Sequence, residues 1–150
     1  MTYLLAPLMS CLIATPLTPN GIDEYRECKK VEIQIDTVRH WQPLIEFYFK
    51  EEDVIQAMRI VFCESTGYAS AIGNNTNGTQ DKGLWQFNDK TFDWLKNKLT
   101  NMTGSWNRLD PTFSTKLASW LVYNDGWYHW NSSKHCWKGT SNELLQIHKQ

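Results

Sequence analysis

The sequence predicts an α+β fold that is mainly α-helical and contains a small β hairpin. An apolar stripe at helical spacing follows residue 51, and start signals for two further helices occur at Asp89 and Asp110. Between these helices, residues 73–83 are rich in Asn, Thr and Gly, which favour turns and short strands. A chain of 150 residues suffices for one packed domain, so we expect these elements to share a single core.

The central helix is predicted to begin at Glu51. Its apolar stripe recurs at intervals of three and four residues and consists of Val54, Ala57, Met58, Val61 and Phe62. At about 100° per residue, Glu64 falls roughly 90° from the middle of this stripe and on the last turn. The pattern therefore places a half-buried carboxyl group at the end of the helix.

Two more helices are predicted after the hairpin. One spans residues 89–99, and the next begins with Asp110 as its cap and Pro111 at its first helical position. Residues 101–109 are expected to form a loop, and residues 142–148 a short helix near the end of the chain.

The first 22 residues carry no charged side chain, and residues 3–17 are mostly apolar. This stretch is too short for a stable membrane span and resembles the apolar part of a secretory signal without its positive start. We therefore predict a leader at residues 1–19, an N-terminal extension at 20–49, a main domain at 50–150, and a secreted or extracytoplasmic protein. Alternatively, residues 8–11 approximate a lipoprotein box that would acylate Cys11.

Residues 23–40 mix charges with a brief alternation of Val31, Ile33 and Ile35, which fits a short strand or a helix surface. If the leader is removed, three cysteines remain, and the simplest arithmetic is one disulfide and one leftover thiol, without assigned partners. The four histidines are scattered and no cysteine pair has zinc-site spacing, so neither a metal nor another cofactor is expected.

The net charge of −1 gives no basic face for a nucleic-acid partner. Eight tryptophans exceed what a core of this size needs, because each indole is bulky and carries an N–H that must find a partner. Some are expected to line a groove, where flat aromatic faces suit sugar rings. A tryptophan-rich core explains the number equally well.

Two carboxyl groups in unlike surroundings are the requirement for cleaving a glycosidic bond: one stays protonated and the other is ionised. Glu64, at the end of an apolar helix, is placed for desolvation, which raises the pKa of a carboxyl group. Asp81 lies in a loop whose hydroxyl, amide and ammonium neighbours favour the charged form. The pair is therefore a candidate acid and carboxylate.

Residues 63–89, CESTGYASAIGNNTNGTQDKGLWQFND, resemble the catalytic segment of the animal-type (chicken-type) lysozyme family. In that family a Glu-Ser pair is followed by an Asn-Thr-Asp-Gly-Ser-Thr-Asp hairpin and Gly-Ile-Phe-Gln-Ile-Asn, in the register seen here. The resemblance implies a lysozyme-like catalytic domain in which Glu64 is the general acid and Asp81 the nucleophile or charge stabiliser. It also implies cleft positions for Asn75, Gln86 and Asn88, whose amides would bind N-acetyl groups and hydroxyls, although Asn88 equally suits a helix cap.

Other residues are similar to lytic transglycosylases and resuscitation-promoting factors. These are Cys63 directly before Glu64, and the run from Gly126 to Trp130 followed by Cys136. This similarity implies a disulfide between Cys63 and Cys136 and places Trp127 as a substrate-binding, apolar cover over Glu64. In the alternative, Trp127 and Trp130 are core residues only.

The resemblance covers roughly residues 50–137, and the chain departs from the animal type in two respects. The eight structural cysteines are absent, and Phe92 and Trp94 replace the tandem tryptophans that bind sugar. The details of sugar binding therefore do not transfer.

Three functions follow. The first is a muramidase that hydrolyses β-1,4 bonds of peptidoglycan or a related chitin-like polysaccharide. The second is a lytic transglycosylase, in which the substrate closes its own 1,6-anhydro ring and Asp81 is dispensable. The third is a catalytically silent, sugar-binding or structural module of a larger assembly, a function that the slightly acidic composition favours.

Overall fold

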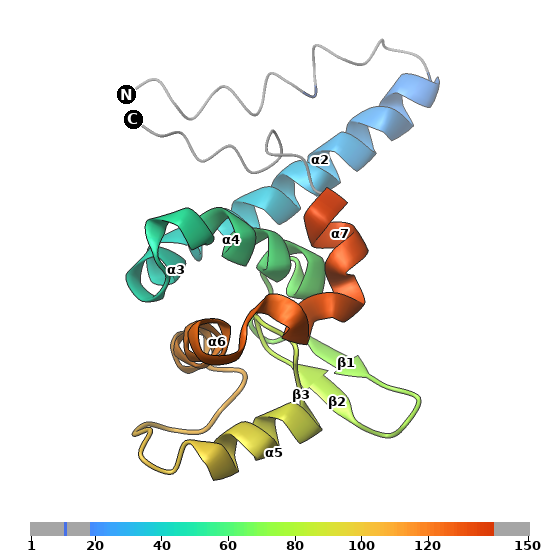
Figure 1. The fold of residues 1–150 in the computed structure, drawn as a ribbon. Helices are drawn as coiled ribbons and strands as arrows, with labels where there is room; N and C mark the ends of the chain where they lie inside the picture. The colour runs from blue at the N-terminus through green and yellow to red at the C-terminus, as the bar shows by residue number, and fades with distance from the viewer. Residues whose placement is uncertain (1–10, 12–18, 140–150) are drawn as a thin grey trace.

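The protein is described by a computed structural model that covers Cys11 and residues 19–139 (Figure 1). The elements are α2 (Pro19–Arg39), α3 (Gln42–Tyr48), α4 (Glu51–Ser65), β1 (Ile72–Asn74), β2 (Gln80–Lys82), β3 (Phe87–Asn88), α5 (Asp89–Lys98), α6 (Pro111–Asp125), the 3₁₀ helix η1 (Trp127–Ser133) and α7 (Lys134–Gly139). The predicted α+β class, mainly helical with a small sheet, is confirmed. The proposed leader, apart from Cys11 and Pro19, and the helix expected at 142–148 lie outside the described residues.

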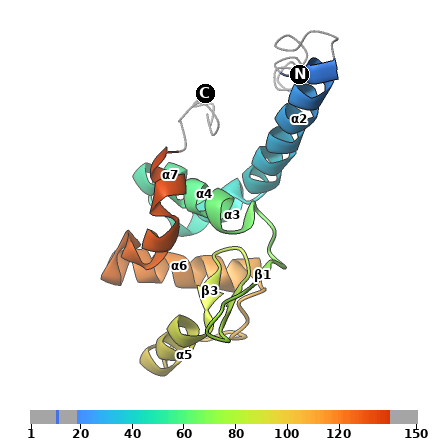
Figure 2. The ribbon, with the colours of Figure 1, turned by 90° about the vertical axis from the view of Figure 1, so that its right-hand side faces the viewer.

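Helix α6 lies between α3 and α4 on one side and α5 on the other, and the sheet stands beside α5 (Figures 1 and 2). The N-terminal half of α2 projects away from these layers in both views. Within the described part of the chain, no helix is long and apolar enough to cross a membrane.

The sheet has three antiparallel strands in the order β1-β2-β3, so the predicted hairpin gains a third, short strand. Asp81 is the central residue of β2, where it pairs with Gly73 of β1 and Asn88 of β3. This register surrounds the Asp81 side chain with residues from both neighbouring strands.

Helix α4 forms where the apolar stripe predicted it, and its buried residues include Val54, Ala57, Met58 and Val61. Acidic residues fill its first turn, where they favour the positive end of the helix dipole. The helix stops at Thr66, which adopts a left-handed conformation with φ 50°. Glu64 therefore lies on the last turn.

The core is built around tryptophans, which accounts for part of their number. Trp85 is fully buried, donates a hydrogen bond to Thr115 on α6 at 3.0 Å, and stacks on Phe49 with ring centroids 5.4 Å apart. Trp130 and Trp137 are buried in the same cluster. Each of these three indole N–H groups has a partner, as a buried donor requires.

Residues 23–39 belong to one long helix, so the alternation of Val31, Ile33 and Ile35 is part of a helix surface, the second of the two structures that it fitted, and does not form a strand. Ile35 is buried against α4, whereas Ile33 is 58% exposed. The end of this helix is fixed where Trp41 donates a hydrogen bond to the Gly67 carbonyl at 2.7 Å.

A second disulfide, between Cys11 and Cys28, replaces the leftover thiol of the sequence analysis. The two-disulfide pattern corrects the prediction of one disulfide, which assumed that Cys11 is lost with a leader. It also conflicts with acylation of Cys11, because a lipid thioether would occupy the sulfur that bonds Cys28.

Arg108, in the loop before α6, binds the end of the sheet where β2 begins and β3 leads into α5. We call this end the base of the sheet. The Arg108 guanidinium donates to the Phe87 carbonyl at 2.7 Å and to the Asp89 carboxylate at 2.5 Å. The Gln80 backbone N–H and Arg108 hold the pKa of Asp89 below its ordinary value. Gly83 packs so closely here that a Cβ atom would lie 1.9 Å from the Arg108 carbonyl oxygen.

Candidate active site

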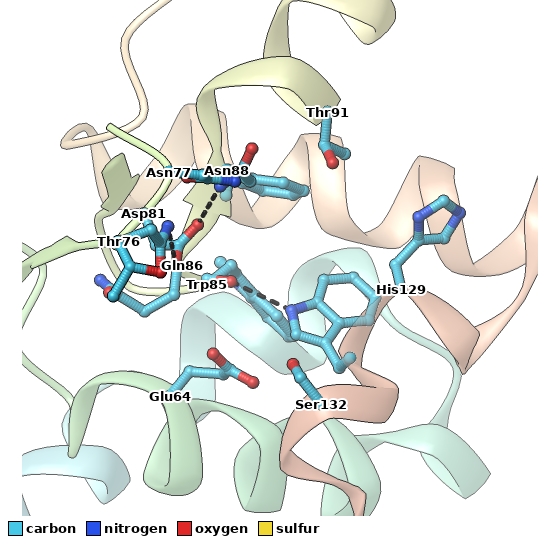
Figure 3. A pocket seen from close by; sticks show the side chains of 13 residues that line it. Glu64, Thr76, Asn77, Asp81, Trp85, Gln86, Asn88, Thr91, His129 and Ser132 are labelled. Atoms are coloured by element: carbon cyan, nitrogen blue, oxygen red, sulfur yellow. Dashed lines mark hydrogen bonds between the residues drawn. The ribbon is translucent and has the colours of Figure 1, made fainter. Parts of the chain in front are cut away.

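A cleft of about 400 Å³ lies between α4 and η1 on one side and the sheet on the other (Figure 3). We call its two sides the helical wall and the sheet wall. The helical wall consists of Glu64 on α4 and His129, Trp130 and Ser132 on η1. The sheet wall includes Asn75, Asp81, Gln86 and Asn88. The two candidate carboxyl groups thus face one cleft from opposite sides.

The Glu64 carboxyl group is half buried on the helical wall. Its Oε1 atom accepts a hydrogen bond from the Ser133 hydroxyl at 2.5 Å. Burial raises the pKa of Glu64, and the negative charge of Asp81 adds to that shift, while the hydrogen bond from Ser133 opposes it. The net direction is upward, which favours the protonated acid at higher pH than an ordinary glutamate allows.

Asp81 has different surroundings on the sheet wall. The Asn75 amide donates to its Oδ2 atom at 2.9 Å and the Asn88 amide to its Oδ1 atom at 2.7 Å. Both amides also donate to the Thr79 hydroxyl. Each carboxylate oxygen is therefore held by an amide, and the Asp81 side chain is fixed in orientation.

Asn88 forms the predicted helix cap and also lies in the cleft. It lines the cleft, and its side-chain oxygen caps α5 by accepting the Lys90 backbone N–H at 3.1 Å. The remaining amide hydrogens face Asp81 and Thr79. Its cleft role in the free protein is therefore to hold Asp81.

Gln86 also lines the cleft, but its side-chain amide nitrogen donates hydrogen bonds to the backbone. That nitrogen donates to the Ala71 carbonyl at 3.1 Å and to the Gly83 carbonyl at 2.8 Å. Its backbone is left-handed, with φ 48°, which is uncommon for a residue with a side chain. Gln86 thus ties the segment before β1 to the turn before β3.

The tryptophan of the helical wall is Trp130, which corrects the placement of Trp127. Trp130 lines the cleft and donates to the Trp85 carbonyl at 3.0 Å. Trp127 is absent from the lining and instead stacks on Phe49 with ring centroids 5.9 Å apart. Within the 3₁₀ helix η1, Trp130 and not Trp127 faces the cleft. The spacing of the two tryptophans in the sequence does not show which of them does so.

The predicted disulfide between Cys63 and Cys136 is present. It joins the residue directly before Glu64 to α7, which continues η1. Because Ser133 lies three residues before Cys136, the bond restrains both partners of the Glu64–Ser133 hydrogen bond.

Sequence reasoning missed Ser133 and His129. Ser133 lies 69 positions from Glu64, and no local pattern links the two. His129 lines the cleft, contacts the Asp125 carboxylate at 2.8 Å, and stacks on Trp94 with centroids 6.1 Å apart. Hydrogen bonds from Tyr128 and His129 lower the pKa of Asp125.

Among the described residues, no group of three or more His, Cys, Asp or Glu side chains is placed to hold a metal ion. The cleft instead offers an acid whose pKa is raised by burial, an oriented carboxylate, and amides along one wall. These groups suit proton transfer to and from a neutral, hydroxyl-rich substrate.

The helical domain, the small sheet and the paired carboxyl groups define a lysozyme-like fold. A comparison with protein-family models identifies the family: residues 50–126, just over half of the chain, match the Transglycosylase SLT domain. The chain belongs to this family, whose substrate is peptidoglycan. The searches of curated proteins and of solved structures returned no match. Two disulfides and a domain that acts on peptidoglycan fit an extracytoplasmic location.

Proposed function

We propose that this protein cleaves the glycan strand of peptidoglycan with Glu64 as the proton donor. One observation carries the proposal: Glu64 is a half-buried carboxyl group of raised pKa that faces an oriented carboxylate across a polar cleft. Residues 50–150 then form the catalytic domain and residues 20–49 an extension of it. A leader for export at residues 1–19 stays attached to the folded protein, because Cys11 is bonded to Cys28.

In the proposed reaction, Glu64 gives its proton to the oxygen of the glycosidic bond, and this bond breaks as positive charge develops at the anomeric carbon. The Asp81 carboxylate offsets that charge from the sheet wall. Glu64, now a carboxylate, accepts the proton of the incoming hydroxyl group, which returns the enzyme to its starting state. Asn75 and Asn88 keep Asp81 in place, Gln86 shapes the sheet wall, and Trp130 limits water on the helical wall.

The incoming hydroxyl group distinguishes two outcomes. We favour lytic transglycosylation, in which the C6 hydroxyl of the same sugar attacks and closes a 1,6-anhydro ring. The family supports this outcome. The hydrogen bonds from Asn75 and Asn88 hold the Asp81 carboxylate in place but leave a lone pair free on each oxygen, so they are compatible with both outcomes.

Hydrolysis by a water molecule, the muramidase reaction, is the second candidate. It is favoured by the position of Asp81 itself, which lies in the cleft and close enough to raise the pKa of Glu64. Transglycosylation has no need of such a carboxylate.

The test is digestion of purified peptidoglycan in water labelled with heavy oxygen, followed by mass spectrometry of the released fragments. Transglycosylation predicts unlabelled fragments that are lighter than the hydrolysis products by one water and resist reduction by borohydride. Labelled, reducible fragments would establish the muramidase reaction instead. An absence of fragments from peptidoglycan and from chitin oligomers would leave the silent, sugar-binding module as the function.

A further inference from the structure

A second depression lies on α2, outside the segment that matches the family. Its volume is about 430 Å³, and it is lined by six side chains of α2, from Tyr25 to Gln34, together with Tyr68. Tyr68 follows the end of α4 by three residues and is 52% exposed. We call this depression the α2 groove.

The charges that line the α2 groove are all positive. Arg26, Lys29 and Lys30 contribute to the lining, and none of the described residues that line it carries a carboxylate. The active-site cleft has the opposite character, since its lining contains Glu64 and Asp81 and no lysine or arginine. One small protein with a net charge of −1 therefore presents two hollows of different charge.

Two of these cations are available to a ligand. Arg26 pairs with Asp23 and Lys30 with Glu27, but all four side chains are largely exposed to solvent. Exposed ion pairs of this kind contribute little free energy, so a ligand can compete for the cations. Lys29 is held more firmly by Glu32, with both side chains mostly covered.

The groove also offers apolar contact. The Tyr25 and Tyr68 rings and the Ile33 side chain line it beside the cations. A suitable ligand thus combines carboxylates with small apolar groups along a narrow chain. A flat anionic membrane is a poorer fit, because α2 also exposes Asp23, Glu24 and Glu27 beside the groove.

We propose that the α2 groove binds the short acidic peptide that branches from the glycan strand, an inference that rests on the proposed function. Peptidoglycan peptides carry free carboxylates and small methyl side chains, which match the cations and the apolar lining. The extension thereby acquires a role: it recognises the peptide branch, whereas the cleft recognises the sugars.

The attachment of α2 to the catalytic segment supports this division. Trp41, just after α2, donates to the Gly67 carbonyl, and a Cβ atom on Gly67 would lie within 3 Å of the Thr37 backbone. The turn that carries Tyr68 leads from the end of α4 into β1. The same stretch of chain therefore contributes to both hollows: Glu64 at the end of α4 lines the cleft, and Tyr68, four residues later, lines the α2 groove.

The test measures binding of N-acetyl-alanyl-γ-D-glutamate, which has two carboxylates, to the full chain carrying Glu64→Gln. Arg26→Gln with Lys30→Gln is expected to raise the dissociation constant by about fivefold or more, since two exposed charge contacts are lost. The matched control, Lys96→Gln with Lys116→Gln, removes the same charge from α5 and α6 and is expected to change it by less than about twofold.

Equal effects of the two double variants would overturn the inference, as would tighter binding of inorganic phosphate or of phosphatidylglycerol vesicles than of the dipeptide. Cleavage of peptidoglycan by the unmodified chain, measured in parallel, separates the two proposals. If glycan is cleaved but the dipeptide does not bind, the groove inference alone is wrong. If the dipeptide binds through Arg26 and Lys30 but no glycan is cleaved, the proposed function is wrong.

Discussion

The two walls of the cleft hold the same chemical group in different ways. On the helical wall, Glu64 is largely shielded from solvent and accepts a side-chain hydrogen bond from Ser133. On the sheet wall, Asp81 accepts an amide on each oxygen. The surroundings of Glu64 thus favour proton exchange, whereas those of Asp81 fix the orientation of its carboxylate.

The difference follows from secondary structure. A helix end can bury a side chain against a neighbouring helix while contributing few donors, because its backbone N–H groups are already used. A central strand residue has neighbours on both sides, so the Asp81 side chain receives one amide from Asn88 of β3 and one from Asn75, directly after β1. The assignment of roles is therefore a consequence of which element carries each acid.

The largest effect is expected when the acid of the helical wall is removed. Glu64→Gln should lower the rate of peptidoglycan cleavage by about 10²–10⁴-fold, the usual contribution of a general acid. Thermal unfolding should be nearly unchanged, because glutamine has the same shape. Glu52→Gln, an exposed change on the same helix, is the control. Normal activity in the Glu64 variant would remove Glu64 from the mechanism.

A smaller effect is expected on the sheet wall. Asp81→Asn removes the negative charge that raises the pKa of Glu64, so that pKa should fall and the decline of activity at high pH should begin at lower pH. Under transglycosylation the maximal rate should fall by about tenfold or less. A loss as large as that of Glu64→Gln would instead support hydrolysis. Rates measured across a pH series distinguish these outcomes.

The smallest effect concerns Ser133, which we predict to be a positioning residue. Glu64 must be protonated to act, so activity is lost as pH rises through its raised pKa. Ser133→Ala removes a hydrogen bond that lowers this pKa, so the decline of activity should move to higher pH. This shift is opposite in sign to that of Asp81→Asn.

Ser132→Ala, at a neighbouring residue that also lines the cleft, serves as the control for this shift. Ser133→Thr keeps the hydroxyl group and should restore the original profile. An unchanged profile for Ser133→Ala would show that the hydrogen bond does not act on Glu64 during turnover.

The features that depend on neighbouring residues were predictable from the sequence. The apolar stripe placed α4, and the Asp110–Pro111 pair placed the start of α6 correctly. Local periodicity and capping determine both of these features. The pairing of Glu64 with Asp81 in one cleft followed instead from the resemblance of residues 63–89 to the lysozyme family.

Features that depend on long-range packing were not predictable. Whether Trp127 or Trp130 faces the cleft is decided by how η1 packs on Phe49 and Trp85. The hydroxyl of Ser133 reaches Glu64 only because the chain returns after the whole of the sheet and two helices. The alternation of Val31, Ile33 and Ile35 fitted a strand or a helix surface, and packing decides for the helix surface of α2, with Ile35 buried and Ile33 exposed.

The contact between Gly83 and Arg108 sets where this cleft can vary. Any side chain at position 83 would collide with the backbone of Arg108, whereas a Cβ atom at Gly78, on the tip of the hairpin, has no atom within 4 Å. The tip therefore has space for change, although the φ of 82° at position 78 favours glycine, whereas position 83 excludes any side chain. Substrate range can diversify by changes in the hairpin tip while the base keeps Asp81 aligned.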